Sequence, residues 1–200
     1  VAIDSERIYV GAQGDSSTNG TDSGAVYVFT LSDGSWVEEA KLHASDGDEG
    51  DNFGHSISVF NDTLVVGAPA DDSNGTDSGA TYVFVRNATG EWNEEVKLIA
   101  SDGAYDDNFG WSVAVGADVA IVGALYANAN GSDSGSLYTY NRTGTNWSEN
   151  SILTGTGTTS NDRLGTSVSI SGNVAVTGAP GYTEKAKETG SIQVFTAQLR

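Results

Sequence analysis

The sequence predicts an all-β fold assembled from repeated four-stranded sheets, and three observations lead to this prediction. The same short markers return at spacings of 56 and 55 residues, as in Phe53-Gly54, Phe109-Gly110 and Leu164-Gly165. Each repeat contains four short apolar or alternating segments separated by turn residues, and none of these segments has the period of a helix. Because a fixed period is typical of repeat architectures, the repeat must be interpreted before any local motif.

Four markers follow one another in the same order in each repeat. After the Phe-Gly pair come Gly67-Ala68-Pro69, then "GATYVF" from Gly79, then a segment led by Trp92. Their counterparts elsewhere begin at Gly11, Gly123 and Gly178, at Gly24, Gly135 and Gly190, and at Trp36 and Trp147. The chain therefore divides into approximate repeats 1–43, 44–99, 100–154 and 155–200 of a single domain.

The second repeat shows what each strand is expected to do. Its strands are expected at about His55–Phe60, Thr63–Ala68, Ala80–Arg86 and Trp92–Leu98. The first alternates small and larger residues, so a neighbouring sheet can approach closely. The second is nearly all apolar, which indicates burial on both faces. The fourth carries Glu94-Glu95 and is expected to be a charged edge strand.

This rise in polarity from the first strand to the fourth favours a β-propeller, in which the inner strands are closely packed and the outer strand is exposed to solvent. At about 56 residues per repeat, the chain holds about three and a half to four blades. It begins within an inner strand and ends after a third strand, whereas repeat arrays need covered ends. We therefore expect it to be part of a larger propeller or assembly, completed by further blades of its parent chain or by neighbouring subunits.

The composition excludes several classes of partner. The net charge is −18, from 27 acidic and 9 basic residues, so nucleic acid and anionic membrane surfaces are repelled. No apolar run approaches the roughly 20 residues of a membrane span, so membrane insertion is not expected. The chain has no cysteine, which removes disulfides and thiolate sites.

Catalysis is not expected either. The two histidines, His43 and His55, are not repeated, and neither is placed beside a repeated serine and aspartate. The glycines precede strands rather than helices, so they do not form a phosphate loop. The sequence therefore predicts a protein that is not an enzyme.

These markers resemble the FG-GAP repeat, the blade unit of the integrin α-subunit head and of many bacterial and archaeal surface proteins. The resemblance covers essentially the whole chain. It implies a β-propeller with a role in adhesion or recognition outside the cell, and a protein or glycan partner at a cell surface. Many such repeats carry a calcium loop between the FG strand and the GAP strand. Here that connection is only "VFNDTLV", too short for a cation that needs about 6–8 oxygens, so the chain resembles the calcium-less variety.

The acidic segment before each Phe-Gly pair provides the candidates for a hard cation such as calcium. These are Asp46, Asp48, Asp51, Asp102, Asp106 and Asp107. The third copy keeps only Asp162, and the spacing does not match an EF-hand. The favoured interpretation is that Asp51, Asp107 and Asp162 accept backbone hydrogen bonds that fix the crossover between blades. No cofactor is expected.

Seven Asn-x-Ser/Thr sequons fall in expected turns or loops, where a glycan could attach. They are headed by Asn19, Asn61, Asn74, Asn87, Asn130, Asn141 and Asn146. We expect some of them to be glycosylated, and an unshifted intact mass of natively sourced protein would contradict this. The alternative for the Asn-Gly sites is that the asparagine simply forms a turn.

Positions at which the repeats differ are the candidates for partner contact. The residue after the Phe-Gly pair is His55, Trp111 or Thr166, at the start of the innermost strand. Trp111 can stack on a sugar or on a partner side chain, or it can pack between blades. The last repeat replaces the acidic Asn-Gly loop with "TEKAKETG", which brings in Lys185 and Lys187.

The sequence therefore favours an extracellular recognition or adhesion module without enzymatic activity. Two alternatives remain open. One is a structural glycoprotein of a surface layer or extracellular filament, and the other is an accessory, sugar-binding propeller of a larger enzyme. Fold analogy alone does not separate them.

Overall fold

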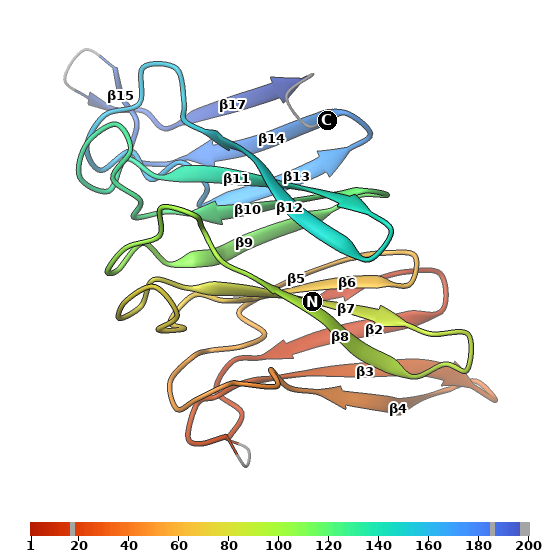
Figure 1. The fold of residues 1–200 in the computed structure, drawn as a ribbon. Helices are drawn as coiled ribbons and strands as arrows, with labels where there is room; N and C mark the ends of the chain where they lie inside the picture. The colour runs from red at the N-terminus through yellow and green to blue at the C-terminus, as the bar shows by residue number, and fades with distance from the viewer. Residues whose placement is uncertain (17–18, 185–186, 197–200) are drawn as a thin grey trace.

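The computed structural model describes residues 1–16, 19–184 and 187–196, which form β-strands joined by turns (Figure 1). The expected all-β class is therefore confirmed. No helix of the described residues is long and apolar enough to cross a membrane.

Four consecutive sheets, called blades 1 to 4, make up the fold. Blade 1 contains β1 (Ala2–Ile3), β2 (Arg7–Ala12), β3 (Ala25–Ser32) and β4 (Ser35–Leu42). Blade 2 contains β5 (Ser56–Phe60), β6 (Thr63–Ala68), β7 (Ala80–Arg86) and β8 (Trp92–Leu98). Blade 3 contains β9 (Phe109–Val115), β10 (Val119–Ala124), β11 (Ser136–Thr143) and β12 (Asn146–Leu153). Blade 4 contains β13 (Ser167–Ser171), β14 (Val174–Ala179) and β17 (Ser191–Thr196), with the small hairpin β15 (Thr183–Glu184) and β16 (Lys187–Glu188) in its loop.

The strands of the second repeat lie close to where the sequence predicts them. β6, β7 and β8 have the expected bounds, and β5 begins one residue later than expected, at Ser56. Neighbouring strands pair antiparallel within the blade. β6 is buried along its whole length, as its apolar sequence predicts.

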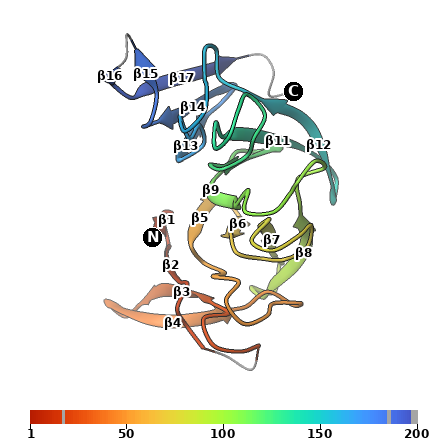
Figure 2. The same cartoon turned by 90° about the vertical axis from the view of Figure 1, so that its left-hand side faces the viewer.

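The four blades follow one another along an open arc (Figures 1 and 2). The first strands β1, β5, β9 and β13 lie on the inner side of the arc, and β4, β8 and β12 lie on its outer side (Figure 2). β5 contacts β9, and β9 contacts β13, so the inner strands also meet from blade to blade. This radial order is that of a β-propeller.

The hydrophobic core is divided among the junctions, by which we mean the contacts between adjacent blades. One buried cluster joins blades 1 and 2, a second joins blades 2 and 3, and a third joins blades 3 and 4. Phe53 illustrates the arrangement, because it is fully buried and packs edge to face against Tyr82 and Phe84. The distances from its ring centroid to theirs are 5.5 and 5.8 Å. Each Phe-Gly pair is therefore a packing element of the junction.

Glycine is required where the backbones of two blades touch. Gly67 of blade 2 lies against the carbonyl oxygen of Gly110 in blade 3, and a Cβ on Gly67 would overlap that oxygen. Gly110 itself has a φ of 94°, which disfavours other residues. The hydroxyl of Ser56 donates a hydrogen bond of 2.7 Å to the same carbonyl. The small residues of the first strand therefore allow close approach and also bond to the next blade.

The Phe-Gly segment also pairs with a loop of the preceding blade. The backbone N–H of Phe109 donates to the carbonyl of Ser78 at 3.0 Å, and that of Asn108 donates to the carbonyl of Asp77 at 3.1 Å. Phe53 and Leu164 make the same contact with Ser23 and Ser134. The "TDSG" loop of one blade thus forms a short parallel ladder with the Phe-Gly segment of the next.

The outer strand is the edge of its sheet, as expected, and its second glutamate also bonds to the next blade. Glu95 accepts a hydrogen bond of 2.8 Å from Arg142 and one of 2.9 Å from the indole N–H of Trp147, both in blade 3. Its side chain is only 12% exposed. Glu39 bonds in the same way to Arg86 of blade 2 at 3.0 Å. The carboxylate is drawn inward because an arginine from the next blade reaches it.

Candidate ligand site at the Phe-Gly end of the blades

A hollow of about 380 Å³ lies at the Phe-Gly end of the first three blades. It is lined by Gln13, Asn52, His55, Pro69, Ala70, Asp77, Asp106, Asn108 and Trp111. These residues come from the two Phe-Gly segments and from the loops after β2 and β6. Because adjacent blades stack in register, equivalent loops of different repeats become neighbours here.

His55 and Trp111 stand side by side in this hollow. Their ring centroids are 4.4 Å apart, with a tilt of 47° between the rings. His55 Nδ1 lies 2.6 Å from the amide oxygen of Gln13, a contact that favours the tautomer with a proton on Nδ1. Burial lowers the pKa of His55, so the imidazole is neutral at pH 7. Thr166, the third residue of this series, instead lines a groove on blade 4.

The polar lining consists of carboxylates and amides. Burial raises the pKa of Asp77, and the nearby charges of Asp72 and Asp106 raise it further. Asn108 donates its side-chain amide to the carbonyl of Asp77 at 2.9 Å. An aromatic ring beside fixed acceptors can bind a ligand that has a flat apolar face and hydroxyl or ammonium donors.

Lys97 of β8 reaches between Asp46 of the acidic loop before Phe53 and Asp71 of the loop after β6. The ammonium of Lys97 lies 2.9 Å from Asp46 and 2.7 Å from Asp71. The hydroxyl oxygen of Tyr82 lies 2.8 and 2.9 Å from the same two carboxylates, which share its single proton as acceptors. Burial lowers the pKa of Lys97, but the hydrogen bonds to Asp71 and Asp46 outweigh this effect and raise it. The position that a hard cation would take is therefore filled by the ammonium group of the chain itself.

The other candidate metal ligands are not gathered around one point. Asp102 accepts a hydrogen bond of 2.8 Å from Tyr138, Asp48 is exposed, and Asp106 lies on the rim of the hollow. Among the described residues, no group of three or more His, Cys, Asp or Glu side chains could hold a metal ion. The six candidate aspartates therefore do not come together as a carboxylate cluster for calcium in the part of the chain that the structure describes.

The last aspartate of each acidic loop is buried and bonds to backbone. Asp51, Asp107 and Asp162 accept from the N–H three residues earlier, at 2.7, 2.8 and 2.6 Å. The second carboxylate oxygen of Asp107 and of Asp162 is buried without a partner among the described residues. Burial raises the pKa of Asp107, because an unpaired buried charge is costly.

Asp51 should make stability depend on pH. Burial raises its pKa to about 6, and the charges of Asp71 and Asp48 add to this shift. Since the pKa in the unfolded chain is about 3.9, the folded state binds the proton more tightly, and the free energy of unfolding should fall as pH rises through 6. After allowance for solvent screening, the loss should be about 1–2 kcal/mol between pH 4.5 and 7.5.

Asp51→Asn isolates this effect, because it keeps an acceptor for the N–H of Asp48 but cannot ionise. In urea denaturation, it should be more stable than wild type at pH 7.5 and similar to wild type at pH 4.5. If the difference in free energy of unfolding between Asp51→Asn and wild type were the same at pH 4.5 and pH 7.5, this role of Asp51 would be contradicted.

The seven sequons fall into distinct environments. Asn19, Asn74 and Asn130 of the Asn-Gly loops donate their side-chain amides to carbonyls of the following crossover, namely Ala44, Ala100 and Gly155, at 3.0, 2.8 and 3.5 Å. Asn61, Asn87 and Asn146 are exposed at the opposite, hairpin end of the blades. Asn141 is partly buried and lines a second hollow there.

We predict that glycosylation favours the hairpin end. A glycan on Asn74 would replace an amide hydrogen next to the contact with Ala100, whereas a glycan on Asn61, Asn87 or Asn146 would extend into solvent. Peptide mapping of natively sourced protein measures occupancy at each site, if the glycans are removed enzymatically in oxygen-18 water so that each formerly glycosylated asparagine gains a mass label. High occupancy at Asn19, Asn74 and Asn130, with none at the hairpin end, would refute the prediction.

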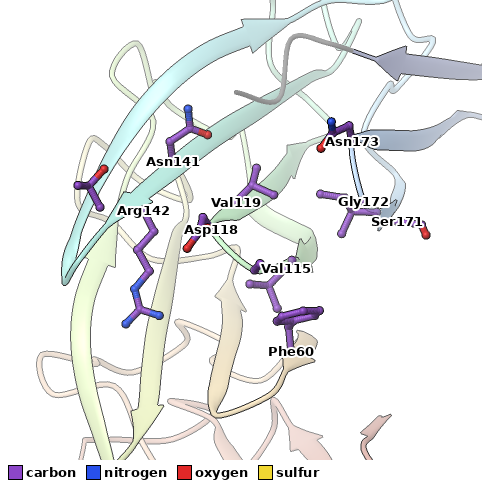
Figure 3. A pocket seen from close by; sticks show the side chains of 13 residues that line it. Phe60, Val115, Asp118, Val119, Asn141, Arg142, Ser171, Gly172 and Asn173 are labelled. Carbon is purple, nitrogen blue, oxygen red and sulfur yellow. The ribbon is translucent and has the colours of Figure 1, made fainter.

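A second hollow, of about 690 Å³, is at the hairpin end between blades 3 and 4 (Figure 3). Figure 3 shows Val119 and Arg142 of blade 3 on one side and Asn173 of blade 4 on the other. Val119 is equivalent to Thr63 of blade 2, which accepts a hydrogen bond of 3.1 Å from Arg142. The residue equivalent to this arginine in the fourth repeat is Ala197, outside the described residues. The arginine that contacts Thr63 across the junction between blades 2 and 3 therefore has no arginine counterpart in the fourth repeat.

The lysines of the last loop can be placed only in part. Lys185 lies outside the described residues, and Lys187 belongs to β16, which pairs with β15. The structure therefore gives no information on their contact with a partner.

Sequence reasoning missed Gln13, Asp77 and the pairing of Lys97 with Asp71. A signal for the pair was present, because Asp15 with Lys41 and Asp71 with Lys97 occupy equivalent positions in two repeats. In the third repeat, the same positions hold Ala127 and Ile152. The lysine and the aspartate are therefore present together or absent together.

Comparison with known proteins agrees with this geometry. The model of the FG-GAP repeat matches residues 1–29, 36–84, 92–140 and 147–195. Each complete match begins with the outer strand of one blade and ends in the third strand of the next, so the sequence unit spans a junction. No curated protein sequence matches the chain. Because the family model matches most of the chain, and the matched segments form the blades of the structure, the chain belongs to the FG-GAP repeat family.

Proposed function

We propose that this chain is a non-enzymatic, extracellular recognition or adhesion module that binds its partner at the hollow around His55 and Trp111. One observation carries the proposal. The position after the Phe-Gly pair differs between the repeats, and in blades 2 and 3 it places two rings 4.4 Å apart in a hollow with polar walls. The repeated residues are accounted for by blade packing, whereas these two rings are not.

The lining points to the chemistry of the ligand. Trp111 offers a face on which a sugar ring or a flat side chain can stack, and Gln13 and Asn108 offer amides. Asp77 and Asp106 can accept hydrogen bonds from hydroxyl or ammonium groups, and they repel anions. The volume of about 380 Å³ lies within the range of small-molecule sites, roughly 300–1,000 Å³. A neutral glycan at a cell surface fits this set best, and a basic loop of a surface protein fits second best.

A non-enzymatic role is supported by the surroundings of His55. Its Nδ1 contacts an amide oxygen rather than a carboxylate, and no serine is among the residues that line the hollow. A histidine that acts as a general base is usually oriented by a carboxylate and lies next to its nucleophile. The hollow therefore suits binding better than bond cleavage.

Trp111→Ala should abolish most of the binding. Removing a stacking aromatic from the centre of a binding site typically weakens affinity by about 2 kcal/mol or more, roughly thirtyfold. A glycan array and a panel of immobilised surface proteins, probed with labelled chain, provide the measurement. Trp36→Ala is the matched control. Trp36 is 47% exposed on the outer strand of blade 1, and it lies next to the β3–β4 turn, at the hairpin end rather than the Phe-Gly end where the hollow is. Equal losses for the two variants, or no ligand on either array, would refute the proposal.

A structural glycoprotein of a surface layer or filament is the second candidate. It is favoured by the three exposed sequons Asn61, Asn87 and Asn146, which lie together at the hairpin end. Regular self-assembly of the glycosylated chain, unaffected by Trp111→Ala, would favour this candidate over recognition. An accessory sugar-binding propeller would use the same hollow and differ only in its parent chain.

A further inference from the structure

The third repeat carries aromatic residues at three positions of the Phe-Gly end where no other repeat has Trp or Tyr, namely Tyr105, Trp111 and Tyr126. The equivalents of Tyr105 are Glu49 and Ser160. Trp111 is replaced by His55 and Thr166, and Tyr126 by Gly14, Ala70 and Gly181. The other junctions are packed without Trp or Tyr at these positions, so blade packing does not require the three rings.

Tyr105 lies at the rim of the hollow around His55 and Trp111, and it is 71% exposed. The next residue, Asp106, lines the hollow, and its backbone N–H donates to the carbonyl of Thr76 at 2.9 Å. This bond holds the segment that carries Tyr105 against the loop between β6 and β7. A ligand that extends out of the hollow past Asp106 would therefore reach Tyr105.

Trp111 and Tyr126 are anchored to the same segment. The backbone N–H of Trp111 donates to the carbonyl of Asn108 at 3.1 Å, and that of Tyr126 donates to the carbonyl of Asp107 at 3.4 Å. Both acceptors follow Tyr105 closely in the chain. The three aromatic residues therefore lie around one short segment at the wall of the hollow.

Tyr126 is partly exposed and stacks with an arginine. The guanidinium of Arg163 lies 5.5 Å from the ring centroid of Tyr126, and Arg163 is exposed. At the other two Phe-Gly pairs the residue equivalent to this arginine is Asn52 or Asn108. The other arginines that the structure describes each pair with a glutamate, whereas Arg163 forms no ion pair with a described residue. Its N–H donors are therefore available to a ligand.

We propose that the Phe-Gly end of blade 3 binds a neutral oligosaccharide, with one sugar unit in the hollow and neighbouring units on Tyr105 and on the pair of Tyr126 with Arg163. This inference rests on the proposed function, and it adds two further subsites and the length of the ligand. The apolar faces of Tyr and Trp rings pack against the C–H faces of sugar rings, while the polar edges of the sugar stay hydrated or hydrogen-bonded.

The polar groups around the rings favour a neutral glycan over an acidic one. Asp77 and Asp106 of the hollow can accept hydrogen bonds from sugar hydroxyls, and Arg163 can donate to hydroxyl or acetamido oxygens. The net charge of −18 repels a polyanionic glycan at longer range. A single guanidinium does not offset this repulsion, so we assign Arg163 to hydrogen bonding with a neutral sugar.

The dependence of affinity on ligand length is the first test. Methyl glycosides of glucose, galactose, mannose and N-acetylglucosamine are compared with the di-, tri- and tetrasaccharides of the same sugars by titration calorimetry. In the series that binds, the trisaccharide should bind at least about tenfold more tightly than the single unit, because each further stacked ring contributes about fivefold. The tetrasaccharide should bind like the trisaccharide.

The residues of other blades supply the variants. Tyr105→Ser introduces the residue type of Ser160, and Tyr126→Ala introduces that of Ala70, so both should fold as wild type does. Each should weaken trisaccharide binding about fivefold and leave binding of the single unit unchanged. Trp111→Ala should weaken the binding of both ligands, since both use the hollow. A merely structural role of the two tyrosines would not produce this dependence on ligand length.

Arg163→Asn gives the fourth repeat the residue type of Asn52 and Asn108. It should weaken the trisaccharide about fivefold without affecting the single unit, because it removes the donors beside Tyr126.

Four results would overturn the proposal. The first is equal affinity for the single unit and the trisaccharide, and the second is trisaccharide binding that neither Tyr105→Ser nor Tyr126→Ala weakens. The third is tighter binding of a trisaccharide that contains glucuronic acid. In these three cases a loss of binding with Trp111→Ala would leave the proposed ligand hollow intact. The fourth is binding of a surface protein, lost with Trp111→Ala, in the absence of binding to any sugar, which would support the hollow and exclude the oligosaccharide.

Discussion

Gly67→Ala should destabilise the protein by about 3 kcal/mol or more, and it should prevent folding at higher temperature. The added Cβ would overlap the carbonyl oxygen of Gly110 and crowd the hydroxyl of Ser56. The carbonyl of Gly110 belongs to the backbone of β9, so it cannot move away without separating blades 2 and 3. The side chain of Ser56 can rotate away only by giving up its hydrogen bond to that carbonyl. The measurement is the free energy of unfolding from urea denaturation, followed by tryptophan fluorescence.

Gly178→Ala is the matched control for this prediction. It makes the same substitution at the equivalent position of blade 4, where the only described atom that the added Cβ would meet is the hydroxyl of the exposed Ser167. We expect a change in the free energy of unfolding of less than about 1 kcal/mol. Similar losses in the two variants would show that the junction geometry is not the cause.

Lys97→Ile should destabilise the protein by about 3 kcal/mol, because it leaves the carboxylate of Asp71 without its cation. The side chain of Asp71 is only 4% exposed, whereas that of Asp46, the other partner, is 55% exposed. The loss should therefore come mainly from Asp71, which water cannot reach. Thermal and urea unfolding of the single variant provide the measurement.

The double variant Lys97→Ile with Asp71→Ala should recover most of the lost stability. It reproduces in blade 2 the combination that blade 3 carries naturally, Ile152 with Ala127. Asp71→Ala alone should also be destabilising, since it removes a partner of both Lys97 and Tyr82. If the two single losses simply added in the double variant, the charge pairing would not be the cause.

Much of the fold could be predicted from the sequence because each repeat shows the same pattern of apolar, small and turn residues. The alternation in β5, the apolar run of β6 and the Trp at the start of β8 each recur at one period, so chance agreement at a single position matters little. The candidate site was predicted only in part. His55 and Trp111 were singled out because they differ between repeats, but their contact depends on how far one blade is rotated against the next.

The acidic loops show why composition alone was misleading. Asp46, Asp51 and their neighbours have the residue types of a cation site, and only the structure reveals that Lys97 fills the space between Asp46 and Asp71. Lys97 lies in β8, far along the chain from Asp46, and no local pattern links them. Contacts between outer strands and the crossover loops depend on the packing of whole blades.

The sequence by itself determined the strands, their order and the family, because hydrophobic period and turn residues act locally and repeat. Only the tertiary structure decided which polar groups meet: Glu95 with Arg142, Lys97 with Asp71, and His55 with Trp111. Within the described residues it also decided that Val176 and Val194 are exposed, whereas the equivalent Val65 and Val83 of blade 2 are buried. The burial of a side chain depends on what packs against it across the junction, and the identity of the residue alone does not specify that neighbour.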